Sequence, residues 1–334
     1  MKENETEEEF MIRTFSKYCD CQIVIEKNPY FTEELDIKDK FFDTKMKYNL
    51  FKECVKAAGG IENYVDNYNK ARSAIVADAV ATESYQQFNG KNSVLMLDYV
   101  QQTLKDNEYR RSNIYTNDNV GKKFISIDMK HANIAILQNI GVYDVNDTYS
   151  DIMRRYNVDG FMANSKKFRQ TVFGRTNEKR IGKYELFNML CIANTFKDIH
   201  GIEPVCVLHD EIIFEYTDEV YDTISSVLET CSKFTGIEYS RSAFTLYLVN
   251  PIKAYMRVFF DRYDSDKDTV VSYDDIVDCK YKFDVKCLKN FYSRALYHWL
   301  SGELVDKDDF HFVYEDLICA VEDELPEFEI SNIM

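Results

Sequence analysis

Apolar and polar positions recur along the chain with two different periods. Between about residues 40 and 110, KYNLFKECVKAAGGIENYVDNY and KARSAIVADAVATESYQQF repeat apolar residues at steps of three and four, which predicts helices. Gly59-Gly60 predicts a break between two of them. The stretch YELFNMLCIANTFKDI (184–199) carries one apolar stripe and predicts a further helix, and another is expected around 219–234.

Two stretches instead show the short apolar runs of β-strands. In KFISID, Phe124, Ser126 and Asp128 share one face of a strand that closes at Asp128, and the intervening isoleucines share the other face. HANIAILQNIG then resumes with a helical period. Residues 205–216, VCVLHDEIIFEY, predict two short strands joined by a polar turn.

This order of elements predicts an α+β fold, a small antiparallel sheet backed by helices. We expect three regions: a helical amino-terminal region over 1–120, a central sheet domain over 121–250 and an acidic helical tail over 251–334. Residues 1–9 are acidic, and we expect them to form a disordered lead.

The composition is that of a protein with buried cores, because 45% of the residues are hydrophobic. The nine cysteines lack the spacing of a metal site, and we expect reduced, mostly buried thiols in a cytoplasmic protein. No apolar run reaches the length of a membrane span, and MKENETEEEF is acidic where a signal peptide would be basic and then apolar.

The formal net charge of -16 opposes binding to a phosphate backbone, which usually requires a basic surface. The charge is unevenly spread, however, and a local basic groove remains compatible with it. The stretch 153–183 is rich in cations: Arg154, Arg155, Lys166, Lys167, Arg169, Arg175, Lys179, Arg180 and Lys183.

Acidic side chains stand at the ends of the predicted strands. Asp128 ends the first, and His209, Asp210 and Glu211 lie between the later two. If these strands are neighbours, the acids converge on one edge, where they suit two divalent cations about 4 Å apart that assist phosphoryl transfer. A polar hairpin turn and a helix cap at Asp128 are the plainer interpretations.

Two of these motifs resemble those of family A DNA polymerases. VLHDEIIFE is similar to the family's carboxy-terminal catalytic motif at a hairpin tip of the palm domain, and FISIDMKHANIAIL looks like its first palm motif. The resemblance covers roughly residues 120–220. It implies that Asp128 and Asp210 bind two Mg²⁺ ions, that Glu211 is an accessory acid and that His209 contacts the primer end.

SKKFRQTVFG resembles the fingers helix of that family. The resemblance implies that Arg169 contacts the triphosphate and Phe173 stacks near the incoming base, with Lys166 as a further cation. A second alignment matches RQTVFGRTNEKRIGKYELF to the later palm helix that leads into His-Asp-Glu. A solvated helix face is the plainer interpretation of Lys166 and Arg169.

The chain departs from the family pattern at the residue that selects the sugar of the nucleotide. The family carries Glu five residues after the first Asp, where it blocks the ribose 2′-hydroxyl, and here that position is Asn133. We therefore expect poor discrimination between the two sugars. The number of residues between the two acidic motifs is smaller than in that family, which implies a reduced fingers domain. This spacing is closer to that of RNA-copying polymerases.

DSDKDTVVSYDD (264–275) matches a twelve-residue EF-hand calcium loop, although Thr269 replaces the turn glycine. A capped acidic turn without calcium is the favoured alternative. The candidate Ca²⁺ ligands are Asp264, Asp266, Asp268, the Val270 carbonyl, Ser272 and Asp275.

The leading hypothesis is a template-directed nucleotidyltransferase, similar to a DNA polymerase of virus or phage type, that uses a nucleic acid primer-template and nucleoside triphosphates. Two alternatives remain open. One is an RNA-copying or primer-making polymerase, and the other is an inactive palm that serves as a scaffold with a basic protein partner.

Overall fold

The computed structural model describes residues 5–19, 23, 26–176, 178–249, 254–260, 278–282, 311–314, 317–320 and 330–331. It divides into two compact units, each assembled from segments that are far apart in sequence. The first unit comprises 1–78, 147–175 and 285–326, and the second comprises 79–146, 176–284 and 327–334.

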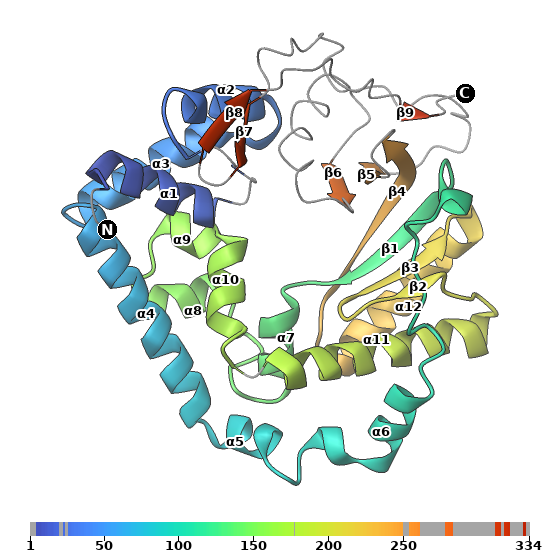
Figure 1. Cartoon of the computed structure of the whole chain (residues 1–334). Coiled ribbons are helices and arrows are strands. Elements are labelled where there is room, and N and C mark those ends of the chain that lie inside the picture. The colour runs from blue at the N-terminus through green and yellow to red at the C-terminus, as the bar shows by residue number, and fades with distance from the viewer. Residues whose placement is uncertain are drawn as a thin grey trace. The chain divides into compact units, whose positions relative to one another are not determined.

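An antiparallel sheet forms the centre of the second unit (Figure 1). Among the described residues it has seven strands in the order β2-β3-β1-β4-β5-β6, with β9 paired to β4. The strands are β1 (Lys123–Met129), β2 (Cys206–Val207), β3 (Glu211–Glu215), β4 (Tyr239–Val249), β5 (Ala254–Phe260), β6 (Asp278–Lys282) and β9 (Ile330–Ser331).

One face of this sheet is covered by the long helix α11 (Glu178–His200). Ile125 pairs with Phe214, and the Phe214 ring meets Phe196 of α11 edge-on at 4.9 Å. Ile127 is fully buried on the same face. This apolar face confirms the predicted alternation along β1 and holds α11 against the strands.

The opposite face carries Phe124, Ser126 and Asp128. At its Phe124 end a second core forms, in which the Phe124 and Phe244 rings stack at 5.6 Å under Ile114. The Asp128 end of this face is more open, because Asp128 is half-buried and not enclosed in that core. Among the described residues, the sheet is therefore covered by a helix on one face and by the Phe124 core at one end of the other.

Shorter helices complete the second unit, and α11 packs against α6 and α7. The predicted helix after β1 is α7, and the one expected around 219–234 is α12. The elements are α5 (Glu83–Asn89), the 3₁₀ turns Val94–Met96 and Asn117–Asn119, α6 (Asp98–Lys105), α7 (Ala132–Asn139) and α12 (Asp218–Thr235).

The first unit is mainly helical around an aromatic core. Phe15 stacks on Phe161 at 5.6 Å, and Phe51 contacts both rings. Its elements are α1 (Glu7–Tyr18), α2 (Tyr30–Phe42), α3 (Thr44–Ala57), α4 (Ile61–Ala81), α8 (Tyr149–Arg155), α9 (Gly160–Asn164), α10 (Lys166–Phe173), β7 (His311–Tyr314) and β8 (Leu317–Ala320). The last three residues of α4, from residue 79 onward, belong to the second unit.

The predicted break at Gly59-Gly60 is confirmed, since α3 ends and α4 begins there and both glycines have positive φ. The disordered lead is wrong from Glu7 onward, because Thr6 and Glu9 form a capping box that satisfies the first N–H groups of α1. A helical tail is also wrong for the described residues beyond 250, all of which belong to strands.

The compact units do not follow the three expected regions. Residues 79–120 belong with the sheet, whereas 147–175 belong with the amino-terminal helices. None of the helices in the described part of the chain combines the length and apolar character needed to cross a bilayer.

Phe196 provides a test of how α11 is held on the sheet. Phe196→Ala should lower the free energy of unfolding by about 3–5 kcal/mol, because it leaves a cavity against Phe214. Urea unfolding measures the change. Ile199→Ala, at a position of the same helix that is 71% exposed, is the matched control and should change stability by less than about 0.5 kcal/mol. Similar losses for both variants would contradict this packing.

Candidate active site

The acidic motifs meet at one edge of the sheet through the pairing of β1 and β3. These strands are antiparallel neighbours, and Asp128 stands directly opposite Glu211. The Met129 N–H donates to the Asp210 carbonyl at 2.9 Å. Directly opposed residues project to the same face with Cβ atoms about 5 Å apart. The structure thus brings Asp128, Asp210 and Glu211 together.

His209 and Asp210 form the two-residue loop of the β2–β3 hairpin. Val207 pairs with Ile212, and the Leu208 N–H donates to the Glu211 carbonyl at 2.7 Å, which closes the turn. His209 and Asp210 are exposed, whereas Glu211 is already the first residue of β3 and is buried. The three polar residues therefore occupy different environments.

Glu211 is held by a buried ion pair. Its Oε1 accepts a hydrogen bond from Ser126 Oγ at 2.5 Å and another from Arg257 Nη1 at 2.6 Å. Arg257 lies on β5 and is 4% exposed, and its guanidinium packs over the rings of Phe244 and Tyr115 at 4.9 and 5.2 Å. The carboxylate of Glu211 is thus paired rather than open to solvent.

The charge of Arg257 is stabilised by this pairing. Burial alone would lower the pKa of Arg257, but the charge of Glu211 and its hydrogen bond outweigh burial, and the pKa is raised above its ordinary value. Arg257 therefore remains a cation beneath the sheet face at neutral pH.

His209 is anchored to α11. Its Nδ1 lies 3.1 Å from the Gly182 carbonyl, and because a carbonyl only accepts, Nδ1 carries the proton and Nε2 is the acceptor nitrogen in the neutral ring. A Cβ at residue 182 would lie 3.6 Å from Nδ1 and 3.9 Å from Glu185 Oε2. The backbone of α11 thus lies close to the loop, at a distance where a Cβ would make only ordinary contacts.

Asn133 belongs to the same unit as the acidic edge. It is the second residue of α7, which begins three residues after β1 ends, and its side chain is half-buried. His131 precedes the helix with a φ of +51°, so the chain turns sharply between Asp128 and Asn133.

The expected fingers residues lie in the other unit, on α10. Phe173 is 1% exposed and packs edge-on against Tyr149 at 6.5 Å, so its ring is buried in this structure, and its role in stacking near the incoming base stays a prediction. The Arg169 guanidinium lies over the Tyr149 ring at 5.2 Å, and Lys166 is exposed.

The stretch that allowed two alignments, 169–187, is divided between two helices. α10 ends at Phe173, and α11 begins at Glu178 and leads into the β2–β3 hairpin. The later half of the stretch therefore belongs to the helix that precedes His209.

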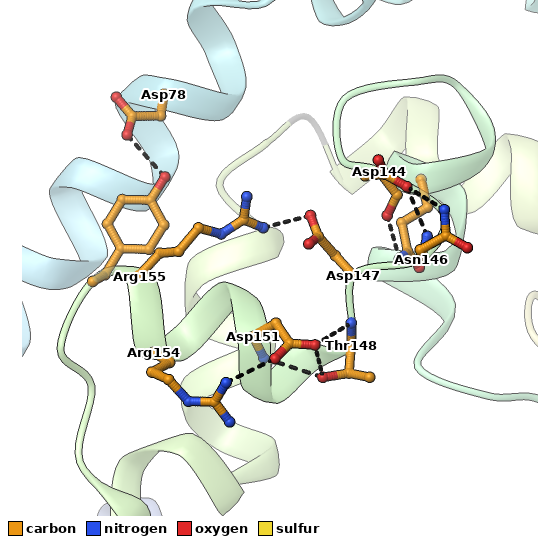
Figure 2. A network of polar contacts seen from close by, with 10 residues as sticks. Asp78, Asp144, Asn146, Asp147, Thr148, Asp151, Arg154 and Arg155 are labelled. Carbon is orange, nitrogen blue, oxygen red and sulfur yellow. Dashed lines mark hydrogen bonds and ion pairs between the residues drawn. The ribbon is translucent and has the colours of Figure 1, made fainter.

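Several cations of the basic stretch are engaged within the protein. Arg154 binds Asp151 at 2.9 Å and Arg155 binds Asp147 at 2.5 Å, as Figure 2 shows. Arg180 donates to the carbonyls of residues 88 and 90. The basic surface available to a phosphate backbone is thus smaller than the count of cations suggests.

Asp128 and Asp210 are the residues of this edge that could hold a magnesium ion. Within the described residues, no group of three or more His, Cys, Asp and Glu side chains is arranged to hold a metal ion. Magnesium in nucleotide-using enzymes is usually bound by one or two carboxylates together with the phosphates of the substrate, which Asp128 and Asp210 could provide. The candidate calcium ligands Asp264, Asp266, Asp268, Val270, Ser272 and Asp275 lie outside the described residues.

Three residues of this site were not among the candidates predicted from the sequence: Arg257, Ser126 and Gly182. Ser126 carried a usable signal, because it shares a strand face with Asp128. Arg257 and Gly182 carried none, since their neighbours are set by the pairing of β5 and by the packing of α11.

Comparison with known proteins adds no assignment: no family model matches the chain, and no curated protein matches it.

The close approach of α11 to the His209 loop can be tested at Gly182. Gly182→Ala should raise the free energy of unfolding by about 0.5–1 kcal/mol, because alanine favours a helix interior and its Cβ would make only ordinary contacts. Thermal or urea unfolding measures the change.

Gly141→Ala is the contrasting control, since its φ is +80° and a Cβ would lie 3.2 Å from Ser84 Oγ. That variant should lose about 1 kcal/mol or more. A loss of stability in Gly182→Ala would mean that the loop lies closer to the helix than described.

Proposed function

We propose that the chain is a template-directed nucleotidyltransferase that joins a nucleoside triphosphate to a primer 3′-hydroxyl. The observation that carries the proposal is the convergence of Asp128 and Asp210 from neighbouring strands, linked by the Met129 N–H and the Asp210 carbonyl. Their similarity to the palm motifs of family A DNA polymerases supports the same chemistry.

Asp128 and Asp210 would hold two magnesium ions. When bound, these ions supply positive charge to the attacking and leaving oxygens at the α-phosphate. The chain's own part is to hold Asp128 on β1 and Asp210 in the adjoining β2–β3 loop, so that less reorganisation is needed when substrate binds. The exposed position of Asp210 leaves this edge accessible to a primer end.

His209 would orient the primer terminus. Because its Nδ1–H is held by the Gly182 carbonyl, Nε2 can accept a hydrogen bond from a hydroxyl. Lys166 and Arg169 lie on α10 in the other unit, and their contact with the triphosphate stays a prediction from the sequence. The net charge of -16 makes a basic protein partner a further part of the proposal, since the complex must hold a phosphate backbone.

Asp210→Asn is the central test of catalysis. Primer extension should fall at least about a hundredfold, because the substitution removes charge that the metal ions need. The assay offers DNA and RNA templates, both kinds of nucleoside triphosphate, and magnesium or manganese. The melting temperature should be unchanged, since Asp210 is exposed.

Asp222→Asn is the matched control: it removes one charge from an exposed position of α12 and should extend primers as the unmodified chain does. Full extension by Asp210→Asn would refute the assignment. Failure of the unmodified chain on every template would instead support the inactive, scaffold form of the palm.

Sugar selection gives a second test, at Asn133. Deoxyribonucleotides and ribonucleotides should be incorporated at comparable rates, because the shorter amide blocks the 2′-hydroxyl less than the glutamate found in family A polymerases. Asn133→Glu should restore a preference for deoxyribonucleotides, while Asn133→Gln controls for side-chain length. Strict rejection of ribonucleotides by the unmodified chain would contradict the prediction.

A further inference from the structure

The buried ion pair between Glu211 and Arg257 affects how many carboxylates can bind a metal ion at the proposed site. Glu211 and Asp128 are directly opposed on one face of two paired strands, so their carboxylates lie within reach of a shared ion. Glu211 nevertheless directs Oε1 at Arg257 and Ser126. Oε1 is thus engaged twice, and the positive charge of Arg257 offsets the attraction of this carboxylate for a cation.

The pair is well buried and well supported. The side chains of Arg257 and Glu211 are 5% and 11% exposed and lie 2.6 Å apart. The rings of Phe244 and Tyr115 pack against the guanidinium. Arg257 comes from β5, two strands beyond β1 in the sheet, and reaches under the edge that bears Asp128.

We propose that Arg257 sets the ligand number of the carboxylate site. By binding Glu211, it leaves Asp128 and Asp210 as the two carboxylates of the metal site, which the substrate triphosphate must complete. Without Arg257, Glu211 becomes a third carboxylate ligand. This inference rests on the proposed function, because it concerns the metal site at the same edge.

Manganese binding, followed by the electron paramagnetic resonance signal of free Mn²⁺, tests the proposal without any activity assay. The titration is made with the full chain, with and without a saturating non-hydrolysable nucleoside triphosphate. The unmodified chain should bind Mn²⁺ weakly alone and more tightly with the triphosphate. Arg257→Met should bind Mn²⁺ alone at least about tenfold more tightly, because a third carboxylate adds attraction at short range.

A paired replacement keeps the test decisive if Arg257→Met folds poorly. Arg257→Met alone leaves the Glu211 charge buried and should lower the melting temperature, whereas Glu211→Leu combined with Arg257→Met removes both charges together. The double variant should fold and bind Mn²⁺ within about threefold of the unmodified chain. Glu229→Leu with Lys233→Met, at an exposed pair on α12, is the matched control and should change neither property.

Two results would overturn the proposal. One is a loss of tenfold or more in Mn²⁺ affinity in the double variant, which would make Glu211 a ligand already. The other is unchanged Mn²⁺ affinity in folded Arg257→Met. Failure of the proposed function looks different: Mn²⁺ would not bind the unmodified chain under either condition, or Asp210→Asn would retain its full affinity.

Discussion

The antiparallel pairing of β1 with β3 is the constraint on which the candidate site depends. The side chains of a strand alternate between faces, so a slip of one residue would move Asp128 to the opposite face from Glu211. The register is set by apolar residues on the other face, where Ile125 pairs with Phe214 and Ile127 with Ile212 under α11. The carboxylates are thus placed by hydrophobic burial.

The Glu211–Arg257 pair shows how the protein accommodates an acid at a buried position. Isolated, either charge would be costly to remove from water. Together they are joined by Ser126 and enclosed by aromatic rings. Glu211 therefore belongs to the structure of the sheet, whereas Asp210 is exposed and Asp128 is half-buried.

Some charged side chains elsewhere in the chain are also engaged within the protein. The net charge is -16, and Arg154, Arg155 and Arg180 make contacts within the protein. Three of the nine cations of the basic stretch are therefore engaged within the protein. A protein with this balance needs either a narrow basic groove or a basic partner to retain nucleic acid.

The sequence by itself determined the elements that depend on local pattern. Periodicity and turn residues, which act over a few neighbours, indicate the alternation of KFISID, the break at Gly59-Gly60, the helix over 184–199 and the β2–β3 hairpin. The candidate acids Asp128, Asp210 and Glu211 could be chosen for the same reason, since each stands at a predicted strand end.

Tertiary structure alone decided which of these residues meet and in what state. Residues 147–175 join the amino-terminal helices because Phe161 packs with Phe15 and Phe51. Glu211 is paired because β5 brings Arg257 beneath it. Such contacts join residues tens of positions apart, and neither residue carries in its own neighbourhood any signal of the partner that folding provides.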